Sequence, residues 1–210
     1  MSPAEREAAE AHLAAADPAM ERLIAHVGPC GLEVRPVADP FEALLRSIVY
    51  QQLAGKAAAT IYGRLRALFP AERPEPEALL TLPDDALRGA GLSRNKLAAA
   101  QDLARKSLDG TVPPLEVLRA LPDDEVVERL TAVRGVGPWT VQMLLIFGLG
   151  RPDVFPATDY GVRRGFARLH GLGEPPPPAE LRQHAEPWRP FRSAAAWYLW
   201  RAADAAELPG

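Results

Sequence analysis

A single carboxylate and a glycine-containing turn are the parts of this sequence whose types and spacing could do chemistry. Asp159 follows a stretch rich in Gly and Pro, from Gly148 to Pro156, and stands at the start of an expected helix. A carboxylate there can stabilise developing positive charge or position a water molecule. The alternative is that Asp159, beside Thr158, only caps the helix, which is the commoner role for such an Asp.

The turn precedes this loop and reads Gly135-Val136-Gly137-Pro138, after a helix end that carries Leu130 and Val133. Glycine tolerates positive φ and a close backbone approach, and Pro138 suits the first position of a helix. The pattern predicts a tight hairpin with free backbone N–H groups at a helix N-terminus, and such groups favour phosphate.

Composition limits the classes of function. The chain has 210 residues, 48% of them hydrophobic, which is enough for one compact domain or two lobes. The net charge is −3 and the isoelectric point about 5.9, so local basic stretches would have to attract any nucleic acid. The one cysteine, Cys30, excludes an intrachain disulfide, a four-cysteine zinc site and a cysteine-ligated iron–sulfur cluster. The histidines have no metal-ligand spacing.

No apolar run approaches the length of a membrane span, and the charged, alanine-rich N-terminal segment is unlike a signal peptide. These two features predict a cytoplasmic protein without membrane association.

The apolar periodicity predicts an all-α protein, because helical patterns are joined by short loops and no stretch alternates like a strand. In the segment 56–69, Ala57, Ile61, Leu65 and Leu68 are predicted to face inward. Residues 51–55 interrupt the helical pattern between this segment and 41–49. The other expected helices are 4–16, 20–27, 76–82, 83–90, 93–108, 115–121, 123–130, one after Asp159, and 179–206 with a break at Pro187 and Pro190.

The hairpin, the Gly/Pro-rich loop and the aspartate, in this order, resemble the helix-hairpin-helix–GPD superfamily of DNA glycosylases. Over about Phe41 to Arg201 the chain is similar to the DNA-3-methyladenine glycosylase II (AlkA-like) family. That likeness rests on Phe41-x-x-Leu44 to Gln51-Gln52, Gly91-Leu92-Ser93-x-x-Lys96, Arg134 to Thr140, Asp153 to Pro156, and Ala185 to Ser193 with Trp200.

The resemblance implies one glycosylase domain over 1–210, in a compact form without the N-terminal β domain of some relatives. Two helical lobes with the active-site cleft between them are expected. A central lobe would cover 41–158 and contain the hairpin at 130–145, and a second lobe would combine 1–40 with 159–210.

Within this family, Asp159 is expected to be catalytic. An N-glycosidic bond breaks with oxocarbenium-like charge on the sugar, which a carboxylate beside C1′ can stabilise. The resemblance also gives meaning to Trp139, which stands where some relatives carry a Schiff-base lysine. The sequence from Leu108 onward contains no lysine at all. A monofunctional enzyme that uses water is therefore expected, although Trp139 could equally be a packed core aromatic.

The loop Gln51-Gln52-Leu53 is the expected wedge, with Gln52 and Leu53 filling the gap that an extruded base leaves. A plain polar turn is the equally weighted alternative. Stacking on an electron-poor methylated purine would use aromatic faces, although core packing is the commoner role of C-terminal aromatics. The candidates for the base pocket are Trp139, Met143, Tyr160 and Trp200.

The hairpin and nearby arginines are expected to bind the DNA backbone, and such contacts position the protein without specifying sequence. A solvated charged face is the usual alternative for each charged residue. Carbonyls of Thr131, Val133 and Val136 would hold Na⁺ or K⁺, as the resemblance implies, and no other cofactor is expected. The expected backbone contacts are Arg134, Gly135, Val136, Gly137, Thr140, Arg163 and Arg164, with Arg168 and Lys96 as further phosphate neighbours.

The resulting hypothesis is a base-excision repair glycosylase that flips alkylated purines, such as 3-methyladenine, out of double-stranded DNA and acts as a monomer. Two alternatives remain. One is a non-catalytic module that uses the hairpin only to grip phosphates. The other is a glycosylase for a different damaged base.

Overall fold

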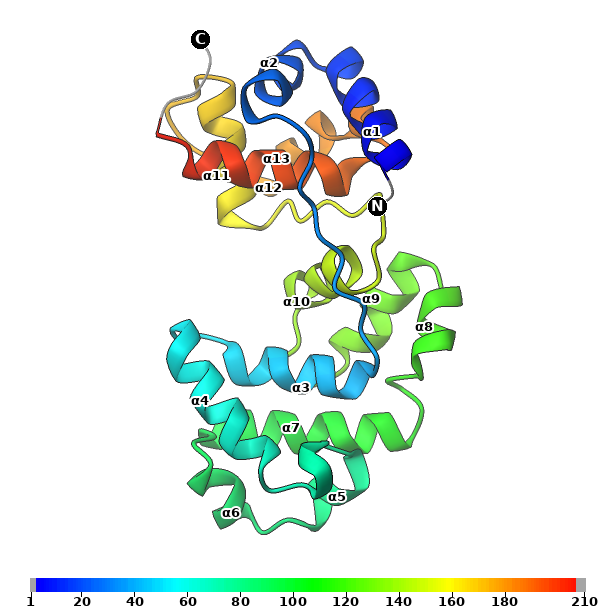
Figure 1. Cartoon of the computed structure of the whole chain (residues 1–210), viewed down its shortest axis with the longest axis vertical. Helices are drawn as coiled ribbons and strands as arrows, with labels where there is room; N and C mark the ends of the chain where they lie inside the picture. Colours follow the sequence, from blue (N-terminus) through cyan, green and yellow to red (C-terminus); the bar gives the residue numbers. More distant parts are fainter. Residues whose placement is uncertain (1–2, 207–210) are drawn as a thin grey trace. The chain divides into compact units, whose positions relative to one another are not determined.

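The computed structural model describes residues 3–206, and every regular element in that range is helical (Figure 1). The predicted all-α class is therefore confirmed. Two compact units make up the chain. One unit joins the segment up to Pro36 to the segment from Gln142 onward, and the other is Val37–Val141.

The division differs from the predicted lobes in where residues 142–158 belong. The prediction assigned them to the central lobe, whereas they cluster with the two ends of the chain. Hydrogen bonds explain this grouping. The Arg35 N–H donates to the Phe147 carbonyl at 2.7 Å, and the Ser193 hydroxyl donates to the Arg151 carbonyl at 2.7 Å.

The inserted unit, Val37–Val141, is organised around its longest helix, α7. Ser93 caps this helix by accepting a hydrogen bond from the Lys96 N–H. Helix α3 packs along α7, and the two lie side by side in Figure 1. Buried leucines and alanines fill the space between them, and their burial drives this packing. The helices are α3 (Pro40–Tyr50), α4 (Gly55–Arg66), α5 (Pro76–Thr81), α6 (Asp84–Gly89), α7 (Arg94–Leu108), α8 (Leu115–Ala120) and α9 (Asp123–Thr131), with a short 3₁₀ turn at Pro70–Glu72.

The predicted inward face of α4 is confirmed at Leu65 and wrong at Ala57. Ala58, Tyr62 and Leu65 are buried, whereas Ala57 is exposed. The run Ala57-Ala58-Ala59 gives the helix no apolar contrast, so the periodicity did not fix the face.

The unit formed by the chain ends packs α11 tightly against α13. Gly165 makes this possible, because a Cβ there would lie 1.9 Å from the Leu199 carbonyl oxygen. Trp188 and Tyr198 are fully buried core residues, as expected for most of the C-terminal aromatics. The helices are α1 (Pro3–Ala16), α2 (Pro18–Val27), α11 (Tyr160–Leu169), α12 (Pro178–His184) and α13 (Arg192–Asp204), with a 3₁₀ turn η3 at Glu186–Trp188.

Helix α10 (Pro138–Met143) follows the hairpin and runs directly into a π-helical turn, η2 (Leu144–Gly148). Such turns widen the helix locally and often mark functional regions. Among residues 3–206, no helix is long and apolar enough to cross a membrane.

Candidate functional site

Asp159 is the N-cap of α11, so the capping role is real. Its Oδ1 accepts a hydrogen bond from the Val162 N–H at 2.8 Å. The same oxygen accepts a second bond from the indole Nε1–H of Trp200 at 2.9 Å. The Asp159 side chain therefore has a second contact besides its cap. Trp200 comes from α13 and fixes the orientation of the half-exposed carboxylate.

Gly161 makes this contact possible, and the sequence analysis missed it. A Cβ at Gly161 would lie 2.9 Å from Cδ1 of Trp200 and 3.1 Å from Oδ1 of Asp159. The Trp200 ring also stacks on Phe147 of η2, with 5.6 Å between centroids. The signal that could have found this glycine is its spacing of four residues from Gly165, which places both on one face of α11.

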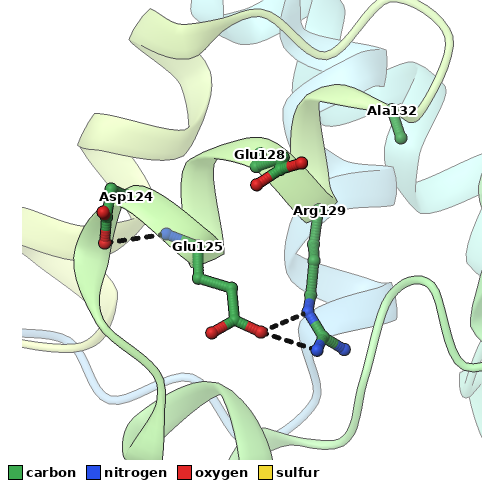
Figure 2. Close-up of a pocket in the computed structure, with 5 residues that line it drawn as sticks. All are labelled: Asp124, Glu125, Glu128, Arg129 and Ala132. Carbon is green, nitrogen blue, oxygen red and sulfur yellow. Dashed lines mark hydrogen bonds and ion pairs between the residues drawn. The ribbon is translucent and has the colours of Figure 1, made fainter.

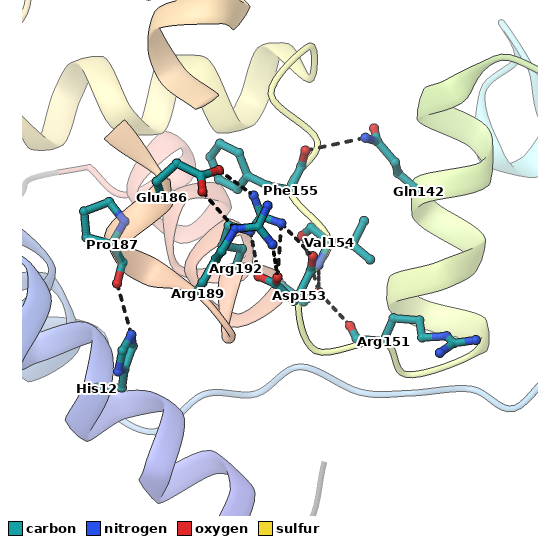
Figure 3. Close-up of polar contacts among 11 residues, drawn as sticks. His12, Gln142, Arg151, Asp153, Val154, Phe155, Glu186, Pro187, Arg189 and Arg192 are labelled. Carbon is teal, nitrogen blue, oxygen red and sulfur yellow. Dashed lines mark hydrogen bonds and ion pairs between the residues drawn. The ribbon is translucent and has the colours of Figure 1, made fainter. Parts of the chain in front are cut away.

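The loop before Asp159 is anchored by an ion-pair network (Figure 3). Asp153 accepts hydrogen bonds from Arg192 Nε and Arg189 Nη1, each at 2.6 Å. Glu186 pairs with the same two arginines. The buried Ser193 accepts from the Val154 N–H at 3.0 Å. The segment 185–193, which carried part of the family likeness, thus fixes the loop to the start of α13.

Three further pocket candidates differ in exposure. Tyr160 is 66% exposed and Trp139 is 47% exposed, so a core role for Trp139 is excluded. Met143 is half-buried at the end of α10. Both aromatic side chains therefore expose part of their surface, each within its own unit.

Among the predicted backbone contacts, Arg163 is hydrogen-bonded within the protein and Thr140 is buried. Arg163 is half-buried and donates to the carbonyls of Pro176 and Pro175, at 2.8 and 3.3 Å, so its guanidinium anchors the proline loop. Thr140 is buried, so its hydroxyl is no surface contact for phosphate. Arg164 and Arg134 are exposed, so a contact of either side chain with a DNA phosphate remains a prediction.

The hairpin between α9 and α10 has the predicted turn. Gly135 adopts φ +77°, and the Val136 N–H donates to the Val133 carbonyl at 3.0 Å. Two N–H groups of the turn that precedes α10 are not free, those of Val136 and Arg134. The Arg134 N–H donates to Asp102 Oδ2 at 2.7 Å. A long-range contact from α7 therefore uses one donor, the Arg134 N–H, that the turn alone would have left free.

Asp102 and Lys106, both on α7, hold the hairpin by hydrogen bonds to its backbone. Lys106 pairs with Asp102 at 2.8 Å, and its ammonium also donates to the Ala132 carbonyl. Burial raises the pKa of Asp102, but the hydrogen bonds from Lys106 and the Arg134 N–H, with the nearby positive charges, outweigh burial. The net result is a pKa below the ordinary 3.8.

The predicted wedge loop turns between α3 and α4. Gln52 has φ +56°, which is uncommon for a residue with a side chain, and it is exposed. Leu53 is 38% exposed. Gln51 Nε2 donates to the Gly135 carbonyl at 2.8 Å and so ties this loop to the hairpin. A hollow of about 400 Å³ lies beside the loop, lined by Ile48, Gln51, Gln52, Ser93, Asn95, Lys96, Ala99, Arg134 and Gly135.

Comparison with known proteins identifies the family. A family model described as "HhH-GPD superfamily base excision DNA repair protein" matches residues 45–190. The chain belongs to the helix-hairpin-helix–GPD superfamily. This confirms the resemblance and the fold that were predicted from the sequence.

One curated sequence and two solved structures support this membership. DNA-3-methyladenine glycosylase 1 of Schizosaccharomyces pombe is 37% identical over 95% of this chain and 88% of its own length. A structure of a 3-methyladenine DNA glycosylase from the same organism, in complex with abasic DNA, matches with a TM-score of 0.79, 37% identity, and coverage of 94% and 97%. A DNA-3-methyladenine glycosidase structure from Bacillus halodurans matches with a TM-score of 0.84, 35% identity, and coverage of 96% and 89%.

The superfamily hairpin suggests a monovalent cation, and the residues present fit one. Thr131 ends α9, so its carbonyl lies at the negative end of the helix dipole. The Val133 carbonyl accepts one hydrogen bond and keeps a second lone pair. Uncharged carbonyls, which Thr131, Val133 and Val136 would supply, suit Na⁺ or K⁺.

Acidic side chains gather elsewhere on α9, around a hollow of about 590 Å³ lined by Asp124, Glu125, Glu128, Arg129 and Ala132 (Figure 2). Glu125 is paired with Arg129 at 2.6 Å. Within residues 3–206, no group of three or more His, Cys, Asp or Glu side chains could hold a metal ion. The acidic hollow is a surface that would repel phosphate.

Proposed function

We propose that this protein is a monofunctional DNA glycosylase that hydrolyses the N-glycosidic bond of alkylated purines, 3-methyladenine in particular, in duplex DNA. The observation that carries the proposal is the carboxylate of Asp159, held by the indole of Trp200 at a helix N-terminus in a superfamily member. The names of the relatives, which are 3-methyladenine glycosylases, favour this substrate class.

The proposed reaction needs only one carboxylate. Breaking the bond between C1′ and the base nitrogen leaves positive charge on the sugar, which the Asp159 carboxylate stabilises. The alkylated purine carries positive charge before the bond breaks, so it leaves as a neutral base without prior protonation. A water hydroxyl then joins C1′, and the released proton passes to a carboxylate or to solvent.

The absence of a nucleophilic amine supports the monofunctional part of the proposal. Trp139 occupies the position at which some relatives have lysine, and no lysine follows Lys106 in the sequence. A Schiff base with C1′ therefore has no amine donor in this segment. Borohydride should not trap the protein on DNA, and a trapped covalent complex would overturn the monofunctional assignment.

DNA engagement is proposed for three parts of the chain. Gln52 and Leu53, exposed at the tip of the wedge loop, would fill the gap left by the extruded base. The exposed ring of Tyr160 and the indole of Trp200 would stack on that base. The hairpin, with Arg134 and a bound cation, would grip a phosphate, so affinity should fall as salt rises.

The test compares base release from alkylated duplex DNA by the wild type and by Asp159→Asn. An asparagine keeps the Oδ1 acceptor for Val162 and Trp200, and it is a good cap, so only the charge is removed. Chromatography of the freed bases should show release of 3-methyladenine by the wild type. Loss of the carboxylate should lower the rate by about 10²- to 10⁴-fold.

The matched control is Asp39→Asn. Asp39 caps α3 by accepting from the Phe41 N–H at 3.0 Å, so the same substitution is made at another capping aspartate. Release should stay normal in this variant. If neither the wild type nor the variant releases any base while both still bind an abasic-site duplex, the result would favour the alternative of a non-catalytic binding module. Release of a different damaged base would change the substrate assignment only.

A further inference from the structure

The wedge loop has a backbone that requires external support. Helix α3 stops at Tyr50, Gln51 leaves the helical region at φ −55° and ψ 133°, and Gln52 adopts φ +56°. A left-handed residue with a side chain persists only where surrounding contacts determine it. Gln52 is itself exposed, so its own side chain does not supply those contacts.

Lys96 supplies them from the first turn of α7. Its ammonium donates to the Val49 carbonyl at 2.7 Å and to the Gln51 carbonyl at 2.8 Å. These are carbonyls at the C-terminal end of α3, where a positive charge complements the helix dipole. One ammonium thereby holds the last turn of α3 and the residue that leaves it, one on each side of Tyr50.

The backbone of Lys96 is itself held in place. Ser93 caps α7 at the Lys96 N–H, and the next residue, Leu97, is buried. Burial lowers the pKa of Lys96, which indicates that the amine is partly withdrawn from water. Its two carbonyl acceptors compensate for that lost hydration.

We propose that Lys96 is a positioning residue for base extrusion, because it fixes the loop that presents Gln52 and Leu53 as the wedge. The inference rests on the proposed function, in which this loop enters the duplex. It replaces the expectation that Lys96 contacts phosphate, since two of the three ammonium donors are directed at the protein backbone.

A second contact extends the effect to the hairpin. Gln51, whose carbonyl accepts from Lys96, uses its side-chain amide to donate to the Gly135 carbonyl. Lys96 therefore sets the loop at the point where it meets the phosphate-binding hairpin. Within this unit, the bond from Lys96 to the Gln51 carbonyl and the bond from the Gln51 side chain to the Gly135 carbonyl together connect the wedge loop to the hairpin.

The experiment uses Lys96→Met, which keeps the length of the side chain and removes the charge and the donors. Single-turnover base release is measured on two duplexes, one with the lesion paired and one with the lesion opposite an abasic site. Extrusion is easier from the second duplex. On the paired lesion Lys96→Met should be slower by about 10- to 100-fold, and on the unpaired lesion the defect should shrink to within about fivefold.

Two variants serve as controls. Lys56→Met removes an exposed lysine from the start of α4, on the other side of the same loop. It should leave both rates and the affinity for DNA unchanged, because within residues 3–206 its ammonium has no hydrogen bond to the wedge loop. Lys96→Arg keeps a charge and two donors and should restore most of the rate. Affinity for an abasic-site duplex should stay near the wild-type value in all three.

The inference fails if Lys96→Met slows both duplexes equally, which would indicate general destabilisation. It also fails if Lys96→Met keeps both rates but binds DNA more weakly and with a smaller salt dependence, which would make Lys96 a phosphate contact. A duplex with 2-aminopurine at the lesion position separates this inference from the proposed function, because the fluorescence rises on extrusion whether or not a bond is cleaved. A wild type that brightens this probe but releases no base refutes only the proposed chemistry, and a wild type that does neither refutes both.

Discussion

The two units differ in the contacts that directly hold their proposed functional side chains and loops. In the unit formed by the chain ends, two glycines allow the close packing that positions the Asp159 carboxylate. Gly161 leaves room for the Trp200 side chain, and Gly165 lets α11 contact the α13 backbone. In the inserted unit, the wedge loop and the hairpin are placed by long charged side chains, Lys96 and Lys106, reaching out from α7.

This contrast separates two kinds of sensitivity. A site placed by close backbone contact should respond to added volume and little to salt, since overpacking forces the structure to shift. Loops placed by ammonium–carbonyl bonds should respond to loss of charge or of a donor, and little to small changes of volume. Single substitutions can test each expectation.

The largest effect is expected for Gly165→Ala. The added Cβ would lie 1.9 Å from the Leu199 carbonyl oxygen, so α11 and α13 must move apart. We expect the free energy of unfolding to fall by about 3 kcal/mol or more, measured by urea denaturation. Gly63→Ala is the control, because a Cβ there meets nothing within 4 Å. Its stability should rise by about 0.5–1 kcal/mol. Equal free energies of unfolding for the two variants would contradict the claim that close packing at Gly165 holds α11 against α13.

The next effect is expected on activity rather than stability. In Gly161→Ala the new methyl group displaces the Trp200 indole and breaks its 2.9 Å bond to Asp159. We expect single-turnover base release to slow by about 10- to 100-fold, corresponding to about 1.4–2.7 kcal/mol of lost positioning. Thermal melting should change by only a few degrees. An unchanged rate would mean that the Trp200 contact does not orient the carboxylate.

The smallest effect is expected for Asp102→Asn, which removes the charge that pairs with Lys106. The free energy of unfolding should fall by about 1 kcal/mol at pH 7. Asp85→Asn, at an exposed acid of α6, is the control and should be nearly neutral.

The pH dependence of this loss has a definite sign. The folded-state pKa of Asp102 is lowered below 3.8, so its stabilisation is present above pH 3.8 and disappears as the pH falls through the folded-state value. The difference between wild type and Asp102→Asn should therefore narrow between pH 5 and pH 3. A constant difference would show that the charge of Asp102 does not stabilise the hairpin.

The sequence was sufficient for features that are local in the chain. The helical class, the Gly135 turn and the cap at Asp159 depend on residues within a few positions of each other. On α4 the prediction was wrong at Ala57, because adjacent alanines carry no polarity contrast, whereas Leu65 is buried as predicted.

Features that depend on distant partners were not predictable. Gly161 matters only because Trp200 lies beside it, and Lys96 bonds to carbonyls 45 and 47 residues away. The same applies to Arg163, whose charge suggested DNA contact but whose guanidinium is used by the proline loop. Charge and residue type are visible in a sequence, whereas the partner that uses them is set by the packing.

The division of the chain also has a consequence for the order in which it can fold during synthesis. Val37–Val141 is continuous, so all of its contacts are available once it has left the ribosome. Helices α1 and α2 are made first, but they belong with α11 and α13, which are made last. A nascent chain halted after Val141 has left the ribosome, but before α13 has done so, should thus protect Val37–Val141 from protease while the segment of α1 and α2 remains cleavable. The unit with the proposed wedge and hairpin would then form before the proposed catalytic part.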